Sequence, residues 1–137
     1  MTTTITSELT GYLSDAHSIE EQALAQLRSA PAMADDAALQ AALAEHLRET
    51  ETHERLVRER LDALGESPSR LKDLIMAIGG KGFLAFARSQ PDTPGKLAAH
   101  AYSYEHLEIA AYELLARAAR AAGDAETEEM AFRILPD

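Results

Sequence analysis

Residues 39–64 read LQAALAEHLRETETHERLVRERLDAL, which is a long amphipathic helical pattern. Spacings of three and four residues place aliphatic side chains on one stripe of this helix, at Leu39, Leu43, Val57, Leu61 and Leu64. The same spacing puts His46, Thr50 and His53 in the middle of the stripe, with Glu49 beside them. A bundle core normally holds aliphatic residues there, because buried imidazoles and carboxylates without partners are costly. A metal ion is one such partner.

The composition indicates one domain with a substantial core. The chain has 137 residues, of which 46% are hydrophobic, so we expect a single domain over residues 1–137. The net charge of −10 argues against nucleic-acid and anionic-membrane partners, because both select for Lys and Arg, and it is compatible with binding cations. The sequence contains no cysteine, which excludes disulfides, thiolate zinc sites and cysteine nucleophiles.

The sequence predicts no membrane or secretory segment. Residues 1–7 lack both the basic start and the apolar run of a secretory signal. The apolar stretch from Leu74 to Ala87 is interrupted by glycines and a lysine at residues 79–82, and it is too short to cross a bilayer. We therefore expect a cytoplasmic protein.

Helical patterns and helix-end signals divide most of the chain. The first helix is predicted from about Ser7, as N-cap, to Ser29, before Pro31. Asp35 or Asp36 is expected to cap the second helix. The second helix is expected to end near Leu64 and Gly65. A third helix is predicted from Pro94 to Ala122, with Thr93 as N-cap and Gly123 as its stop. A last helix is predicted from Ala125 to Leu135, capped by Asp124.

A broken helical segment from Arg70 to Arg88 joins the second and third helices of this scheme. Such a long crossing connection is typical of ferritin-like bundles, in which one connection must run the length of the bundle. The last helix is short and looks incomplete. We therefore predict an all-α, ferritin-like up-down four-helix bundle with a long helical crossover and a short last helix.

Three predicted helices carry candidate metal ligands on their inward sides. Di-metal carboxylate sites in bundles take a Glu from each of two helices and a Glu-x-x-His pair from each of the others, since residues three or four apart point the same way. Oxygen ligands with a single nitrogen suit iron or manganese. The candidate ligands, from the first helix to the third, are Glu20, Glu49, His53, Glu105 and Glu108.

The pattern departs from a complete di-metal site. Glu-x-x-His does not occur in that order, and Glu49 precedes His53 by four residues. The short last helix offers only the carboxylates of residues 126, 128 and 129.

Each candidate also has a structural interpretation. Glu20 is a solvated residue if Ile19 takes the core position. In the structural interpretation, Glu49 and His53 form an i,i+4 pair on a flank of their helix, and the pair stabilises the helix by only about 0.2–0.5 kcal/mol. Glu108 fits the inward stripe better than Glu105. For other polar groups the structural interpretation is preferred. His17 and His46 are interpreted as satisfied core or boundary histidines, and Tyr12, Tyr104 and Tyr112 as core aromatics. A solvated helix face is expected at Arg55, Arg58 and Arg60.

A family resemblance lies in four blocks of the sequence: DAHSIE at residues 15–20, ETETHER at 49–55, LGESP at 64–68 and EHLEIAAY at 105–112. Together these blocks resemble the YciF-like group of ferritin-like proteins. The resemblance covers nearly the whole chain. It implies a ferritin-like bundle that is often dimeric, a link to bacterial stress responses and a di-iron site. Members of the group usually continue beyond a segment like residues 133–137 with further glutamates on the last helix.

Two hypotheses of function follow. In the first, the bundle binds iron or manganese, with Glu49 as a bridging ligand and His53 as a terminal ligand, and it performs oxidation or peroxide handling. In the second, the protein is a metal-free structural or interaction module, whose polar core groups pair with each other and fix the helix register. The second hypothesis also predicts oligomerisation, because an unfinished bundle exposes an apolar groove. We expect a homodimer or a higher homo-oligomer.

Overall fold

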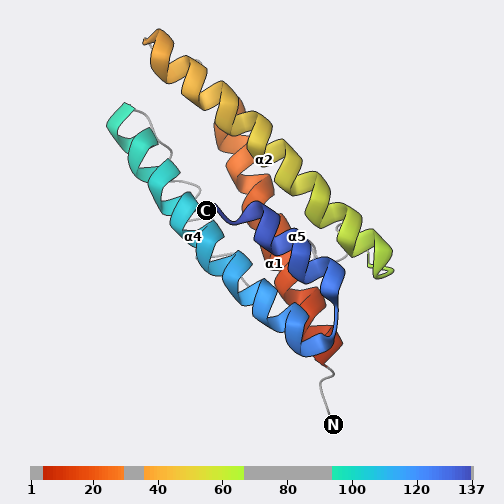
Figure 1. Ribbon diagram of the computed structural model, residues 1–137. Coiled ribbons are helices and arrows are strands. Elements are labelled where there is room, and N and C mark those ends of the chain that lie inside the picture. Colours follow the sequence, from red (N-terminus) through yellow and green to blue (C-terminus); the bar gives the residue numbers. More distant parts are fainter. Residues whose placement is uncertain (1–4, 30–35, 67–93, 137) are drawn as a thin grey trace, which may run out of the picture.

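The computed structural model describes residues 5–29, 36–66 and 94–136. Its four helices are α1 (Ile5–Ser29), α2 (Ala37–Ala63), α4 (Pro94–Ala122) and α5 (Ala125–Ile134), and the described residues contain no strand (Figure 1). The predicted all-α, ferritin-like bundle is confirmed, including its short last helix. None of the helices in the described ranges is long and apolar enough to span a membrane.

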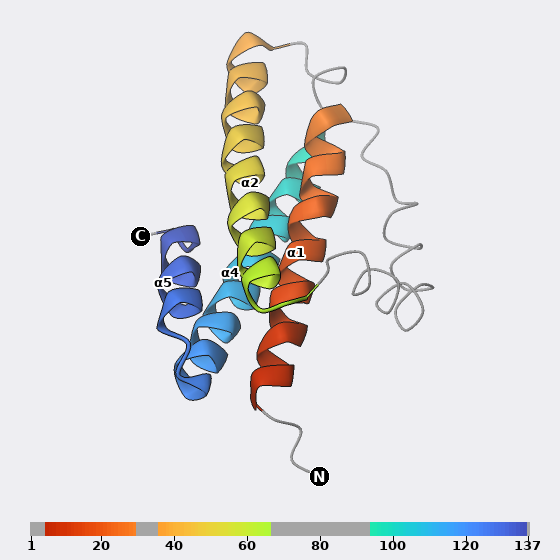
Figure 2. The ribbon, with the colours of Figure 1, turned by 90° about the vertical axis from the view of Figure 1, so that its right-hand side faces the viewer.

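The helix directions are those of a ferritin-like bundle. In Figures 1 and 2, α2 runs antiparallel to α1, α4 runs in the same direction as α2, and α5 turns back along α4. The end of α2 and the start of α4 therefore lie at opposite ends of the bundle, which is what a long crossover between them requires. The segment predicted to make that crossover, Arg70 to Arg88, lies outside the described residues.

The helix ends follow the sequence signals at most positions. The carboxylate of Asp36 accepts a hydrogen bond from the backbone N–H of Leu39 at 2.9 Å, as an N-cap residue does. Gly65 and Gly123 have φ values of 77° and 74°, a left-handed conformation that glycine adopts without strain at a helix C-terminus.

The predicted start of α1 is wrong by two residues. The helix begins at Ile5, so Ser7 lies inside its first turn and is not the N-cap. The hydroxyl of Thr10 donates to the carbonyl of Thr6 at 3.0 Å, a bond within the helix. Because Ser and Thr hydroxyls can bond inside a helix as well as cap it, a Thr-rich segment does not mark the start of a helix.

Among the described residues, the core consists of two apolar clusters with a polar layer between them. The larger cluster is built around α5 and the facing parts of the other helices, and its buried members are Leu9, Leu13, Ala16, Val57, Leu61, Tyr112, Leu115, Ala116, Ala119, Met130, Ala131 and Ile134. The smaller one joins Leu27 to Leu43. Between them along the helices lie the buried polar residues Glu20, Thr50 and Glu108.

The short helix α5 packs mainly on α4 and is tied to α2 by Arg60. Arg60 lies 3.2 Å from Asp124, 2.5 Å from Glu126 and 3.1 Å from the hydroxyl of Thr127. The prediction that Arg60 belongs to a solvated face is therefore wrong, since its side chain is only 17% exposed. Its partners come from the last helix, more than sixty positions away, which a helical pattern does not reveal.

Candidate metal centre

Three side chains from three helices meet in the polar layer. Glu20 from α1, His53 from α2 and Glu108 from α4 each bring one ligand atom to a common point, and these atoms all lie within 4.8 Å of one another. Glu20 is completely buried, Glu108 is 8% exposed and the His53 side chain is 23% exposed. Two carboxylate oxygens and one imidazole nitrogen at such spacing form a partial coordination shell for a cation.

The hydrogen bonding of these groups is incomplete. The hydroxyl of Tyr112 donates to Glu20 Oε1 at 2.6 Å. His53 Nδ1 lies 3.6 Å from the same oxygen, which is too long for a hydrogen bond. Within the described ranges, the buried side-chain atoms without a hydrogen-bond partner are Glu20 Oε2, His53 Nδ1 and Glu108 Oε1. All of them belong to this cluster, and unpaired buried polar atoms of this kind are uncommon and costly.

The electrostatics of the cluster disfavour its negative charge. Burial, followed by the nearby charges of Glu20 and Glu105, raises the pKa of Glu108 from 4.5 to about 8. The pKa of the Tyr112 hydroxyl is also raised, first by burial and then by Glu20, whose charge repels a phenolate and whose carboxylate accepts a hydrogen bond from the neutral phenol. Two carboxylates at close range in a buried site repel each other, and a bound cation removes that repulsion.

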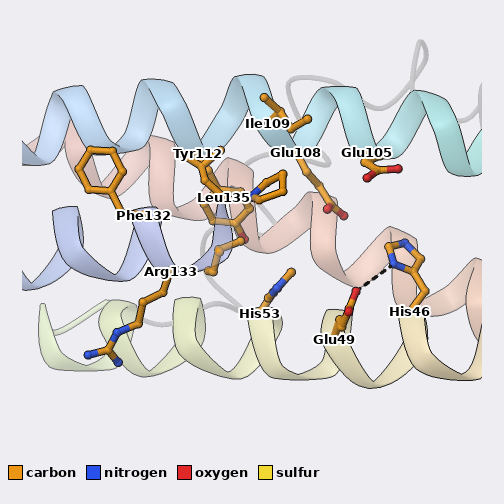
Figure 3. A pocket seen from close by; sticks show the side chains of 12 residues that line it. His46, Glu49, His53, Glu105, Glu108, Ile109, Tyr112, Phe132, Arg133 and Leu135 are labelled. Atoms are coloured by element: carbon orange, nitrogen blue, oxygen red, sulfur yellow. Dashed lines mark ion pairs between the residues drawn. The ribbon is translucent and has the colours of Figure 1, made fainter.

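A cavity of about 470 Å³ opens beside the cluster, between α2, α4 and the end of α5. Figure 3 shows His53 and Glu108 pointing into the space between α2 and α4. Besides His53 and Glu108, the charged and polar residues at the cavity include His46, Glu49, Glu105 and Arg133, and its apolar wall includes Ile109, Phe132 and Leu135. Small molecules can therefore reach the cluster from one side.

The structure brings together Glu20, His53 and Glu108 of the five candidate ligands. Glu49 and Glu105 line the same cavity but lie outside the compact group. The Glu49 side chain is 57% exposed, and its carboxylate lies 3.6 Å from Nδ1 of His46. The role of all five as metal ligands stays a prediction.

The alternatives at single positions have clear outcomes. Glu20 takes the inward position that Ile19 would otherwise fill, and Ile19 is half-buried. His17 is a buried histidine whose Nε2 lies 3.0 Å from Glu54 Oε1, so it is satisfied by a partner outside the cluster. Both results agree with the inward face predicted for α1.

The hydroxyl of Tyr112 is the functional group that sequence reasoning missed. Tyr112 was expected to be a core aromatic, and its ring does lie in the larger apolar cluster. The available signal was its position four residues after Glu108, which places both side chains on one face of α4. The hydrogen bond itself depends on how α1 and α4 pack.

The comparisons with known proteins identify the family. Residues 5–137 match the family model described as a domain of unknown function, DUF892. The chain belongs to this family. A search of curated proteins gives no significant match.

Among solved structures, the chain is similar to a protein from Xanthomonas campestris pv. campestris, known from a crystal structure. The two are 25% identical, with a TM-score of 0.74, and the match covers 96% of this chain and 80% of the other. The family and this neighbour agree with the bundle fold and are consistent with the YciF-like resemblance, and neither names an activity.

Proposed function

We propose that this DUF892 chain binds iron or manganese between α1, α2 and α4 and uses the metal for oxidation or peroxide handling. Two observations carry the proposal: Glu20, His53 and Glu108 each have a buried atom without a hydrogen-bond partner, and one ligand atom from each residue lies within 4.8 Å of the others. Burying carboxylate and imidazole atoms without hydrogen-bond partners costs free energy, and a cation bound between them would offset that cost.

The donor set fits the proposed metals. Carboxylate oxygens with one imidazole suit iron and manganese, and the described cluster contains no thiolate that would favour a softer ion. Three protein ligands also leave coordination positions open. The adjoining cavity supports the pairing of this ion with a second one, because Glu49 and Glu105 line it together with Glu108.

When bound, iron or manganese supplies one-electron chemistry. Glu20, His53 and Glu108 would hold the ion between the two apolar clusters, and the cavity would admit a small oxidant from one side. A link to bacterial stress responses, which the YciF-like resemblance implies, belongs to this proposal.

The test of the redox function is a stopped-flow measurement on protein loaded anaerobically with ferrous iron and mixed with hydrogen peroxide. Each hydrogen peroxide molecule would oxidise two ferrous ions to ferric ions, one electron from each. With two protons from solvent it would be reduced to two water molecules. We expect the protein-bound iron to react faster than the same iron free in buffer, and Glu20→Gln to abolish the difference. Glu54→Gln is the matched control, since Glu54 pairs with His17 outside the cluster. Equal rates for bound and free iron would contradict the redox function.

A metal-free structural module is the second candidate, and the raised pKa of Glu108 favours it. With a pKa of about 8, Glu108 carries a proton at neutral pH, and a protonated carboxyl can donate a hydrogen bond to a neighbour instead of repelling it. This candidate predicts that Glu108→Leu keeps or raises stability and that no metal co-purifies in stoichiometric amount. Metal content therefore separates the two candidates.

A further inference from the structure

We propose that Tyr112 is a positioning residue of the metal centre, which occupies one oxygen of Glu20 and reserves the other for the ion. The inference rests on the proposed metal-binding function and adds a role for a residue outside the ligand set. Its basis is the unequal environment of the two Glu20 oxygens. Oε1 accepts the Tyr112 hydrogen bond at 2.6 Å, and Oε2 has no partner among the described residues.

Tyr112 is built to hold its hydroxyl in a fixed place. The residue is 1% exposed, and its ring packs in the larger apolar cluster with Leu13, Leu115 and Ala116. A tyrosine ring has only two side-chain torsions, so close packing of the ring fixes the direction of the O–H group. That group reaches from α4 to α1, the helix that carries Glu20.

The hydroxyl adds nothing to the apolar packing. A phenylalanine at this position would fill the same space in the cluster, and it would leave Glu20 Oε1 buried without a donor. A carboxylate with both oxygens free can bind an ion through one oxygen or through both. Hydrogen bonds to ligand carboxylates fix ligand orientation, and their loss typically weakens metal binding about 10–100-fold.

Tyr104 provides a matched control on the same helix. It is also buried, eight positions before Tyr112, and its hydroxyl lies 3.4 Å from Gln22 Oε1. It borders a different small cavity, next to Leu27, Leu43 and His46. Tyr104→Phe therefore removes a tyrosine hydroxyl from α4 and leaves the hydrogen bond from Tyr112 to Glu20 in place.

The test uses cobalt(II) as the probe, because its visible absorption weakens as coordination number rises. We expect Tyr112→Phe to bind cobalt about 10–100-fold more weakly than the wild type. We also expect a weaker visible band, because both Glu20 oxygens become available to the ion. Tyr104→Phe should match the wild type in affinity and spectrum. An unchanged affinity and spectrum in Tyr112→Phe would overturn the positioning role, whereas failure of the wild type to bind cobalt would overturn the metal site itself.

A second measurement on folded protein keeps the inference testable if Tyr112→Phe does not fold. Cobalt loading should shift the ultraviolet absorption of tyrosine in the wild type and in Tyr104→Phe, because the ion draws charge from the Glu20 carboxylate, which accepts the hydrogen bond of the Tyr112 hydroxyl. Stoichiometric cobalt binding with no change in tyrosine absorption would contradict the inference.

Discussion

At the scale of single residues, the site depends on acidic groups that the fold forces into close contact. Glu20 and Glu108 share a buried layer with His53, and burial together with the neighbouring carboxylates raises the pKa of Glu108 to about 8. The ordinary value for a glutamate is 4.5. Proton binding to Glu108 is therefore favoured in the folded state, and it links the stability of the metal-free protein to pH.

We predict that the metal-free protein loses stability as pH rises from about 4.5 to about 8. The folded-state pKa is raised, so the contribution of Glu108 is present in full at low pH and disappears as pH passes through the folded-state pKa. The slope for one proton is about 1.4 kcal/mol per pH unit. Urea unfolding across this range should show the slope in the wild type and in Glu113→Gln, an exposed control on the same helix. A Glu108→Gln variant with the wild-type slope would contradict the prediction.

The sequence predicts which side chains face the bundle interior, but it does not predict which partners they bond. Periodicity predicted that Glu20, His53 and Glu108 face inward, since each continues an apolar stripe. It did not decide firmly between Glu105 and Glu108, because residues three apart share a face and only the packing of α1 on α4 selects one of them. The bond from Tyr112 to Glu20 joins residues 92 positions apart, beyond the reach of any local pattern.

At the scale of secondary-structure elements, α5 is held at its start by a network around Asp124. The Asp124 carboxylate accepts hydrogen bonds from the backbone N–H of Thr127 at 3.0 Å and from its hydroxyl at 2.5 Å, and Arg60 approaches from α2. Burial alone raises the pKa of Asp124, but the bonds from Thr127 and the charge of Arg60 outweigh that effect and lower it. Asp124 thus both caps α5 and ties it to α2.

We predict that Asp124→Ala destabilises the protein more than Asp36→Ala does. Asp36 is a plain N-cap with one bond to Leu39, so its loss should cost about 1 kcal/mol. The Asp124→Ala change removes the cap of α5 and leaves Arg60 with fewer partners, so the loss of stability should reach about 2 kcal/mol or more. Denaturant unfolding of both variants measures the difference. Equal losses would show that the Arg60 contact adds nothing.

Element boundaries could be predicted wherever the chain carries a specific terminator. Asp36, Gly65, Gly123 and Asp124 all act as the sequence suggested, because capping carboxylates and left-handed glycines are local features. The prediction for Ser7 is wrong because α1 begins at Ile5, and a Ser or Thr hydroxyl can also bond inside a helix, so its presence does not mark a helix end.

At the scale of the whole molecule, the polar layer joins α1, α2 and α4 between two apolar clusters. An ion bound there would contact all three helices at once and would bind only when they are assembled. Metal binding is therefore expected to stabilise the complete bundle through mass action.

We predict that ferrous iron or manganese raises the melting temperature of the wild-type protein and that a chelator reverses the increase. The gain is about 2.7 kcal/mol at a free metal concentration 100 times the dissociation constant. His53→Leu should melt at the same temperature with and without metal, because it removes the imidazole ligand. The control Glu54→Gln should respond like the wild type. A metal response retained by His53→Leu would argue that the ion binds elsewhere.

Self-association remains a prediction from the sequence. Sedimentation velocity should give a mass at least twice that of the chain if the protein is a homodimer or a larger homo-oligomer. A species with the mass of one chain at all tested concentrations would contradict that expectation.

The proposal that Glu20, His53 and Glu108 hold a metal ion is tested most directly by elemental mass spectrometry. The protein would be loaded anaerobically with ferrous iron or manganese and then freed of weakly bound metal by desalting. We predict stoichiometric metal in the wild type and in Glu54→Gln, and none in a variant that combines Glu20→Gln, His53→Leu and Glu108→Gln. Wild-type protein without stoichiometric metal, or a combined variant that retains it, would contradict the account.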